Sequence, residues 1–273
     1  MPDGIPSNIG RDLSICDQGL GLALADGNEW MFVGEDASTS AIISQLRTIL
    51  QLGSLIRPSC KISVERKWNS YRSSPEENIP LFDTFVQIMK TIHRDVLARE
   101  GLFLHGALAE RNGFGVILAG PSGVGKTTAS NRLPSPWRSL SDDMTLVVRD
   151  AQGRYCGHPW PTWSFFRESK NSRHMWDVSY EVPLEGLFFL AQASEDRVER
   201  IGAGRASCML LETARQASGP LYEKSRNEDP LAMNLQLFNN ACIMSKSVKS
   251  FTLNVSLNGQ FWNEMDLALN SPI

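Results

Sequence analysis

The sequence predicts an α/β protein with a mixed β-sheet flanked by helices, and three observations lead to this fold class. Strand-like and helix-like segments are mixed throughout the 273 residues, without repeats or low-complexity tracts. Pairs of apolar runs joined by Asp-Gly or Asn-Gly give more hairpin signals than a strictly alternating βαβ chain would. A glycine-rich phosphate-binding pattern lies between an apolar strand and a helix, as in nucleotide-binding α/β folds.

The composition limits the class of protein and its partners. With 42% hydrophobic residues the chain can bury a sizeable core. Its 27 basic and 30 acidic side chains give a net charge of -3, so no global field favours nucleic acid or an anionic membrane. The sequence has neither a basic, apolar leader nor an apolar run of about 20 residues, so we expect a cytoplasmic protein. The oligomeric state stays open, a homo-oligomer included.

The first elements are expected to be a hairpin and a helix. Two short apolar runs flank Asp26-Gly27, a dipeptide that tolerates the positive φ of a hairpin turn. A helix is then expected from Ser38, a suitable N-cap, to Gly53, because apolar residues recur there at helical spacing. Residues 61–68 predict a strand.

The best candidate for a linker is the polar stretch 69–80, which contains two prolines and cannot pack as an element. We therefore expect an amino-terminal α/β region, 1–78, which is a candidate for substrate recognition. The second unit, 79–273, contains the glycine-rich loop. It opens with an amphipathic helix over 81–101, in which His93 is expected to be structural.

Around the glycine-rich loop the sequence predicts a hairpin and then a short helix. Two strand-like runs meet at Asn112-Gly113, so the strand that enters the loop is expected to pair with the strand before it. Pro134 and Pro136 end the helix after the loop. The later elements are expected as a hairpin over 144–158, a strand over 184–192, a helix over 206–218, an apolar segment over 231–244 and a strand over 250–259.

The five cysteines are scattered, and no CxxC pair or nearby His gives them metal-ligand spacing. We expect reduced, mostly buried thiols. They are Cys16, Cys60, Cys156, Cys208 and Cys242.

Residues 120–127, GPSGVGKT, fit the pattern G-x-x-x-x-G-K-[ST] at every position. Glycines let successive backbone N–H groups converge on phosphate oxygens, and the following helix adds the partial positive charge of its amino end. Lys126 is expected to reach the β and γ phosphates, and the Thr127 hydroxyl to ligate Mg²⁺. Thr128 either contributes or only faces solvent. The predicted nucleotide-binding set is Gly120, Pro121, Ser122, Gly123, Val124, Gly125, Lys126, Thr127 and Thr128.

An acid pair follows the loop by some fifteen residues, at the front of an apolar strand. One carboxylate of Asp142 and Asp143 can hold Mg²⁺, and the other can accept a proton from an attacking hydroxyl. The alternative is a solvated pair in a turn.

Three further residues are candidates with weaker signals. His105 lies on the strand before the loop, where it is either a core residue or, through the predicted hairpin, a neighbour of the bound phosphates. His158 belongs to an aromatic and proline-rich segment that either walls a substrate site or packs a loop. Arg173, in a basic stretch, either contacts substrate or is solvated.

The order LHGALAERNGFGVILAGPSGVGKTT and then LSDD resembles the HPr kinase/phosphorylase family. It is similar as well to small relatives encoded with ribosomally made peptide cassettes, such as lasso-peptide kinases and the SynChlorMet cassette protein ScmC. The resemblance implies a fold like that of phosphoenolpyruvate carboxykinase around the nucleotide. It implies ATP and Mg²⁺ as cofactors, and transfer of the γ-phosphate to a Ser or Thr hydroxyl.

Carried over by position, the resemblance implies that Lys126 and Thr127 hold phosphates and Mg²⁺, Asp142 is the base, Asp143 contacts the metal and His105 assists. The chain lacks the glycine-rich ERGLG-like signature that HPr kinase/phosphorylases carry after the acid pair. HPr is therefore not the expected substrate, and the cassette proteins are the closer resemblance. The expected partner is a small peptide or protein; a metabolite kinase and an ATP-binding or ATPase module are the alternatives.

Overall fold

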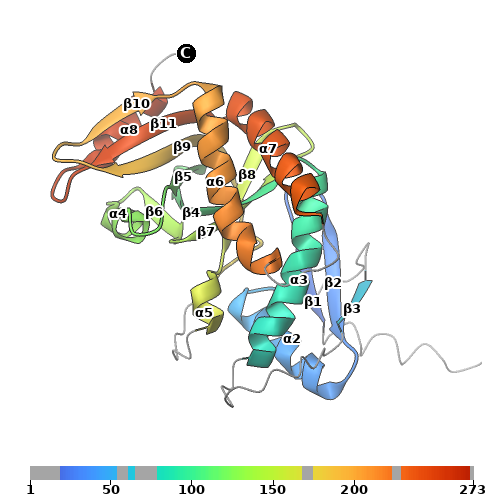
Figure 1. The fold of residues 1–273 in the computed structure, drawn as a ribbon. Helices are drawn as coiled ribbons and strands as arrows, with labels where there is room; N and C mark the ends of the chain where they lie inside the picture. Colours follow the sequence, from blue (N-terminus) through green and yellow to red (C-terminus); the bar gives the residue numbers. More distant parts are fainter. Residues whose placement is uncertain (1–18, 54–60, 65–78, 168–174, 223–228, 271–273) are drawn as a thin grey trace, which may run out of the picture.

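A computed structural model describes residues 19–53, 61–64, 79–167, 175–222 and 229–270 (Figure 1). It contains one large mixed sheet and one small sheet, with helices against both. The mixed α/β class predicted from the sequence is confirmed. None of the helices in these ranges is long and apolar enough to cross a membrane.

The small sheet is formed by the amino-terminal strands in the order β1-β2-β3. β1 and β2 make the hairpin expected around Asp26-Gly27, and β3 adds parallel to β2. Helix α2 packs on this sheet, but its predicted N-cap, Ser38, was wrong. The cap is Asp36, whose carboxylate accepts the backbone N–H of Thr39 at 2.7 Å. The bounds are β1 Leu20–Ala23, β2 Glu29–Gly34, α2 Ala37–Ile49 and β3 Lys61–Val64.

The large sheet has the order β10-β11-β9-β5-β4-β7-β8, and β6 pairs with β4 beside β7. β5, β9 and β11 run parallel to one another, whereas β4 is antiparallel to β5, β6 and β7. β8 pairs with the start of β9 as well, so the sheet curls back on itself. The strands are β4 Leu102–Arg111, β5 Phe114–Ala119, β6 Arg138–Ser141, β7 Met144–Arg149, β8 Tyr155–Trp160, β9 Val182–Gln192, β10 Arg197–Arg200 and β11 Lys249–Val255.

Helices cover both faces of the large sheet, and the alternation of side chains along β5 shows why. Ile117 and Ala119 pack in a cluster with α6 and α7, whereas Val116 and Leu118 pack in a cluster with α4 and α8. β5 is thus buried on both sides, apart from its first residue. The helices are α3 Ile79–Ala98, α4 Lys126–Arg132, α5 Trp163–Arg167, α6 Ala203–Tyr222, α7 Pro230–Ser247 and α8 Phe261–Asn270.

Most predicted elements are present, with shifted ends. The short helix after the loop is α4, and the segments 206–218 and 231–244 fall within the longer helices α6 and α7. No sequence pattern predicted β6, β10, α5 or α8. Most of the predicted linker, 69–80, lies outside the described residues.

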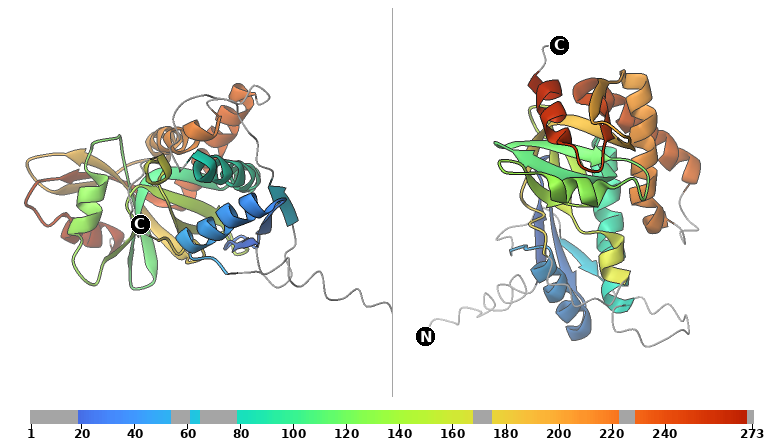
Figure 2. Two further views of the ribbon diagram at one scale, coloured as in Figure 1. Left: turned by 90° about the horizontal axis from the view of Figure 1, so that it is seen from below. Right: turned by 90° about the vertical axis from the view of Figure 1, so that its left-hand side faces the viewer.

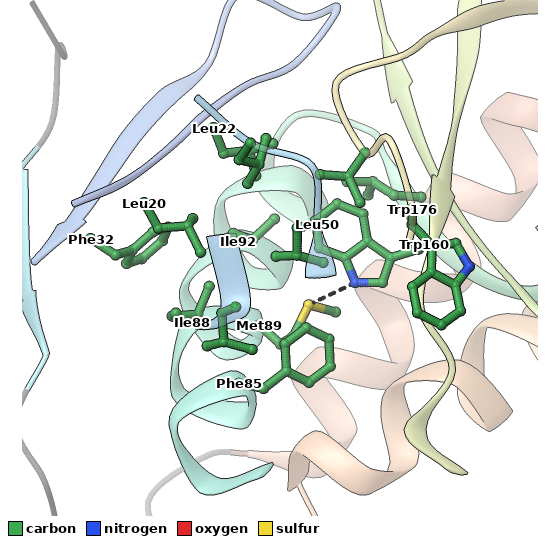
Figure 3. Packing of buried hydrophobic residues seen from close by; sticks show 14 of the residues in the cluster. Leu20, Leu22, Phe32, Leu50, Phe85, Ile88, Met89, Ile92, Trp160 and Trp176 are labelled. Atoms are coloured by element: carbon green, nitrogen blue, oxygen red, sulfur yellow. Dashed lines mark hydrogen bonds between the residues drawn. The ribbon is translucent and has the colours of Figure 1, made fainter. Parts of the chain in front are cut away.

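One hydrophobic cluster crosses the predicted boundary between residues 78 and 79. It combines Leu22 and Phe32 of the small sheet with Phe85 of α3 and Trp160 of β8 (Figure 3). Trp160 donates its indole N–H to the sulfur of Met89 on α3 at 3.0 Å. In both views of Figure 2 the small sheet and α2 lie against α3. The predicted boundary therefore does not separate two cores.

The described cysteines are free thiols, as expected. The expectation that they are mostly buried was wrong, because Cys156 is buried but Cys242 is half-buried and Cys208 is exposed. Cys16 and Cys60 lie outside the described residues.

His93, on α3, is a core residue, as predicted. Its ring nitrogens bond to the hydroxyls of Ser218, at 2.9 Å, and Tyr222, at 2.6 Å, on α6. Burial lowers the pKa of His93 to about 4. His158, on β8, is equally buried, and burial lowers its pKa to about 4 despite the hydrogen bond to the carbonyl of Val178 and the charge of Asp177. Both rings are therefore neutral inside the folded protein at neutral pH.

The shared cluster predicts that Phe32→Ala destabilises the whole described fold. Phe32 is fully buried, and removing its ring should lower the free energy of unfolding by about 3–5 kcal/mol. Urea unfolding followed by tryptophan fluorescence and by far-UV circular dichroism should give one coincident, shifted transition. Phe114→Ala, at a half-exposed ring, is the control with a small effect. If urea unfolding shows two transitions and Phe32→Ala shifts only one of them, the shared core is contradicted.

The buried histidines predict a loss of stability in mild acid. The unfolded chain binds their protons near pH 6.5 and the folded chain only near pH 4, so stability falls as the pH drops through this window. The free energy of unfolding falls by up to about 3 kcal/mol for each of the two histidines. His93→Gln should be less stable at pH 7 but show a shallower slope of unfolding free energy against pH. An equal slope in the variant and the unsubstituted protein would refute the role of His93.

Candidate phosphate-binding site

The phosphate-binding loop joins β5, which ends at Ala119, to α4, which begins at Lys126. Its three glycines, Gly120, Gly123 and Gly125, have backbone φ angles of +153°, +80° and +105°. Residues other than glycine rarely adopt such angles. A Cβ atom at Gly123 or Gly125 would meet no atom within 4 Å. The loop backbone is therefore open to close approach by a ligand, which fits the expected phosphates.

The loop is supported by a side chain that no sequence pattern marks. Gln192, the last residue of β9, donates from its amide nitrogen to the carbonyls of Gly123 and Val124, each at 3.4 Å. Helix α4 has no side-chain cap at its amino end, so its first N–H groups are left for a ligand. Only the parallel pairing of β9 with β5 reveals Gln192, because it lies 68 residues after Val124 in the chain.

Lys126 is buried at the start of α4 and turns back over the loop. Its ammonium donates to the carbonyls of Gly120, at 3.0 Å, and Pro121, at 3.2 Å. Burial lowers the pKa of Lys126, and the negative charge of Asp143 partly offsets this. The ammonium is thus held against the carbonyls of the first two loop residues.

The remaining loop residues lie at the surface. Pro121, Ser122, Thr127 and Thr128 are exposed, and Val124 is half-buried. Thr127 follows Lys126 directly and is exposed, so its hydroxyl would be available to hold a metal ion. Within the described ranges no group of three or more His, Cys, Asp and Glu could hold a metal ion. Mg²⁺ at nucleotides usually takes several of its ligands from phosphates and water and only one or two from carboxylates.

The acid pair occupies a break between two strands that pair with the same edge of β4. Ser141, the end of β6, lies opposite Leu108, and Met144, the start of β7, lies opposite His105. Asp142 and Asp143 thus fall beside the middle of β4. The other edge of β4 pairs with β5, where Gly106 lies opposite Ala119, the residue before the loop. One strand therefore brings the acids, His105 and the phosphate-binding loop together.

The structure distinguishes the two acids. Asp143 accepts a hydrogen bond from Nε2 of His105 at 2.7 Å. Burial by itself would raise the pKa of Asp143, but this bond and the charges of His105 and Lys126 outweigh burial and hold the pKa below its usual value. Asp142 is half-buried and makes no hydrogen bond or ion pair with another described residue. Asp143 is thus an anchored carboxylate and Asp142 a free one.

His105 is not a purely apolar core residue. Its side chain is 17% exposed, with Nε2 on Asp143 and Nδ1 at 2.7 Å from Oε1 of Gln216 on α6. Gln216 is a second residue that could not be found from the sequence, because nothing local marks it among the polar residues of that helix.

The two candidate substrate residues fare differently. His158 is fully buried: Nδ1 donates to the carbonyl of Val178 at 3.0 Å, and Nε2 accepts from the backbone N–H of Ala25 at 3.4 Å. With both nitrogens engaged it has no free polar atom for a substrate, so we correct its assignment to a packing residue that joins β8 to the turn of the β1–β2 hairpin. Arg173 lies outside the described residues.

Comparison with known proteins assigns a family to the part of the chain that contains this site. The model of the SynChlorMet cassette protein ScmC family matches residues 72–270, which include the loop, the acid pair, His105 and Gln216. A protein of Fusobacterium nucleatum subsp. nucleatum, named "Putative HPr kinase/phosphorylase", is 41% identical over 64 residues. These are 23% of this chain and 10% of that protein, so the chain spans a small part of that relative. The chain belongs to the SynChlorMet cassette protein ScmC family.

Proposed function

We propose that this protein is an ATP- and Mg²⁺-dependent kinase that transfers the γ-phosphate to a Ser or Thr hydroxyl of a small peptide or protein. The observation that carries the proposal is the anchored carboxylate of Asp143, bonded to His105 and interacting with Lys126 beside an open phosphate-binding loop. A loop that only held a nucleotide would need no histidine-bound acid next to its lysine. Such a constellation fits phosphoryl transfer.

The proposed roles follow from the geometry of each side chain. Lys126 would leave the carbonyls of Gly120 and Pro121 and donate to the phosphate oxygens instead. Asp142 bonds to no other side chain in the described part of the chain, so it would accept the proton of the attacking hydroxyl as general base. Asp143 and Thr127 would hold Mg²⁺, which neutralises charge on the β and γ phosphates when it is bound. His105 would keep Asp143 oriented and ionised.

A peptide or small protein is the acceptor that best fits the family. The match to a cassette protein family supports a substrate encoded in the same cassette, namely a ribosomally made precursor peptide. A metabolite kinase, the alternative, would need a closed pocket for its substrate, which the aromatic segment 160–166 could line. Trp160, Trp163 and Phe166 instead pack in the hydrophobic cluster with α3, so nothing there favours a metabolite site.

The direct test is incubation of the full chain with γ-labelled ATP, Mg²⁺ and candidate precursor peptides. We expect label on a Ser or Thr of one peptide, and Lys126→Ala should reduce transfer at least about 100-fold by removing the charge that stabilises the migrating phosphoryl group. Glu185→Gln, an exposed residue near the opposite end of β9 from the loop, is the matched control with unchanged transfer. Label released only as free phosphate would reject the kinase and favour the ATPase alternative.

Asp142→Asn separates catalysis from nucleotide binding. Asparagine keeps the size of the side chain but cannot act as the base, so phosphoryl transfer should fall by about 100-fold or more while ATP affinity stays within about twofold. Calorimetric titration with a non-hydrolysable ATP analogue and single-turnover transfer assays measure the two quantities. If the variant transfers phosphate at the unsubstituted rate, Asp142 is not the base.

A further inference from the structure

Gln216 lies on α6, a helix that neither the loop nor the acid pair belongs to, yet its amide touches His105. We propose that Gln216 is a positioning residue of the phosphoryl-transfer site, which aims Nε2 of His105 at Asp143. This inference rests on the proposed function. The contact that carries it is the 2.7 Å hydrogen bond between Oε1 of Gln216 and Nδ1 of His105.

The orientation of the Gln216 amide is set by a second residue on the same helix. Its Nε2 donates to Oε1 of Glu212, one turn earlier, at 2.9 Å. A carboxylate oxygen can only accept a hydrogen bond, so the NH₂ end of the amide must face Glu212. The oxygen end is thereby turned towards His105.

The orientation of this amide determines which ring nitrogen of His105 faces Gln216 and whether that nitrogen carries a proton. An amide oxygen can only accept a hydrogen bond, so Nδ1 must carry a proton and donate a hydrogen bond to Oε1 of Gln216. A ring flipped about its Cβ–Cγ bond would place carbon atoms where the two nitrogens now bond, and would lose both the Gln216 and the Asp143 contacts. With Nδ1 held, Nε2 points at Oδ1 of Asp143, the carboxylate that interacts with Lys126. Gln216 therefore fixes the orientation of the His105–Asp143 pair from the side opposite the acid.

The part of α6 that carries Gln216 is itself anchored. The carbonyl of Ala217 accepts the indole N–H of Trp163 on α5 at 3.0 Å. The hydroxyl of Ser218 bonds to the buried ring of His93 at 2.9 Å. Two consecutive residues after Gln216 are thus tied to other elements, which limits the movement of the helix turn and suits a positioning role.

The first test measures the NMR signals of the His105 ring nitrogens and needs no kinase activity. Correlation spectra of the ring nitrogens, assigned with His105→Gln among the four histidines of the chain, should show Nδ1 protonated in the unsubstituted protein. Gln216→Leu should shift the Nδ1 signal, and the double variant Glu212→Gln/Gln216→Glu, which keeps a hydrogen bond between these two positions and an acceptor facing His105, should retain it. Arg215→Leu is the matched control, because Arg215 is exposed and bonds to Asn234. Unchanged His105 signals in Gln216→Leu would overturn the proposal.

The second test reads catalysis with the labelled peptide assay. Gln216→Leu should lower kcat about tenfold with KM for ATP within about twofold, and the double variant Glu212→Gln/Gln216→Glu should keep most of the activity. In a His105→Gln background, Gln216→Leu should cause no further loss, because both residues act through the same ring. Additive losses, or an equal loss in the double variant Glu212→Gln/Gln216→Glu, would make Gln216 merely structural. If the unsubstituted protein transfers no phosphate, the proposed function fails, while the ring signals still decide whether Gln216 orients His105.

Discussion

The pairing of β4 on both of its edges is the constraint on which the site depends. On one edge β4 pairs with β5, which delivers the phosphate-binding loop, and on the other it pairs with β6 and β7, which flank the acids. His105 and Gly106 lie on β4 between them. The regular hydrogen bonds of a sheet hold paired residues at defined spacings, which loops alone could not do. The helices on both faces of the sheet then exclude water from the strands and keep this register.

The sequence predicted those parts of the site that local patterns determine. The loop follows from its glycines and Lys126, and the β4–β5 hairpin follows from Asn112-Gly113, whose positive φ values the structure confirms. Together these two signals are enough to place His105 beside the loop. The position of the acid pair was likewise readable, because it stands directly before the apolar strand β7, which is buried apart from its last residue.

The rest could not be predicted, because it depends on contacts between distant segments. Gln192 and Gln216 are two glutamines without a local signature, and only the β5–β9 pairing and the packing of α6 on β4 bring them to the site. The burial of His158 similarly depends on Ala25, far earlier in the chain. The boundary after residue 78 was predicted from prolines and polar residues. These residues indicate the local backbone conformation, but not which apolar surfaces pack together.

The two-residue break between β6 and β7 limits which insertions and deletions the chain can accept without displacing the acid pair. Ser141 and Met144 are both fixed by pairing with β4, so Asp142 and Asp143 fill a gap of two residues. An insertion or deletion there would have to slip one strand along β4 and turn its side chains to the opposite face of the sheet. Loops at the rim of the sheet carry no such requirement. The distance between the acid pair and the glycine-rich loop is therefore set by the sheet, and the residues around them can diverge.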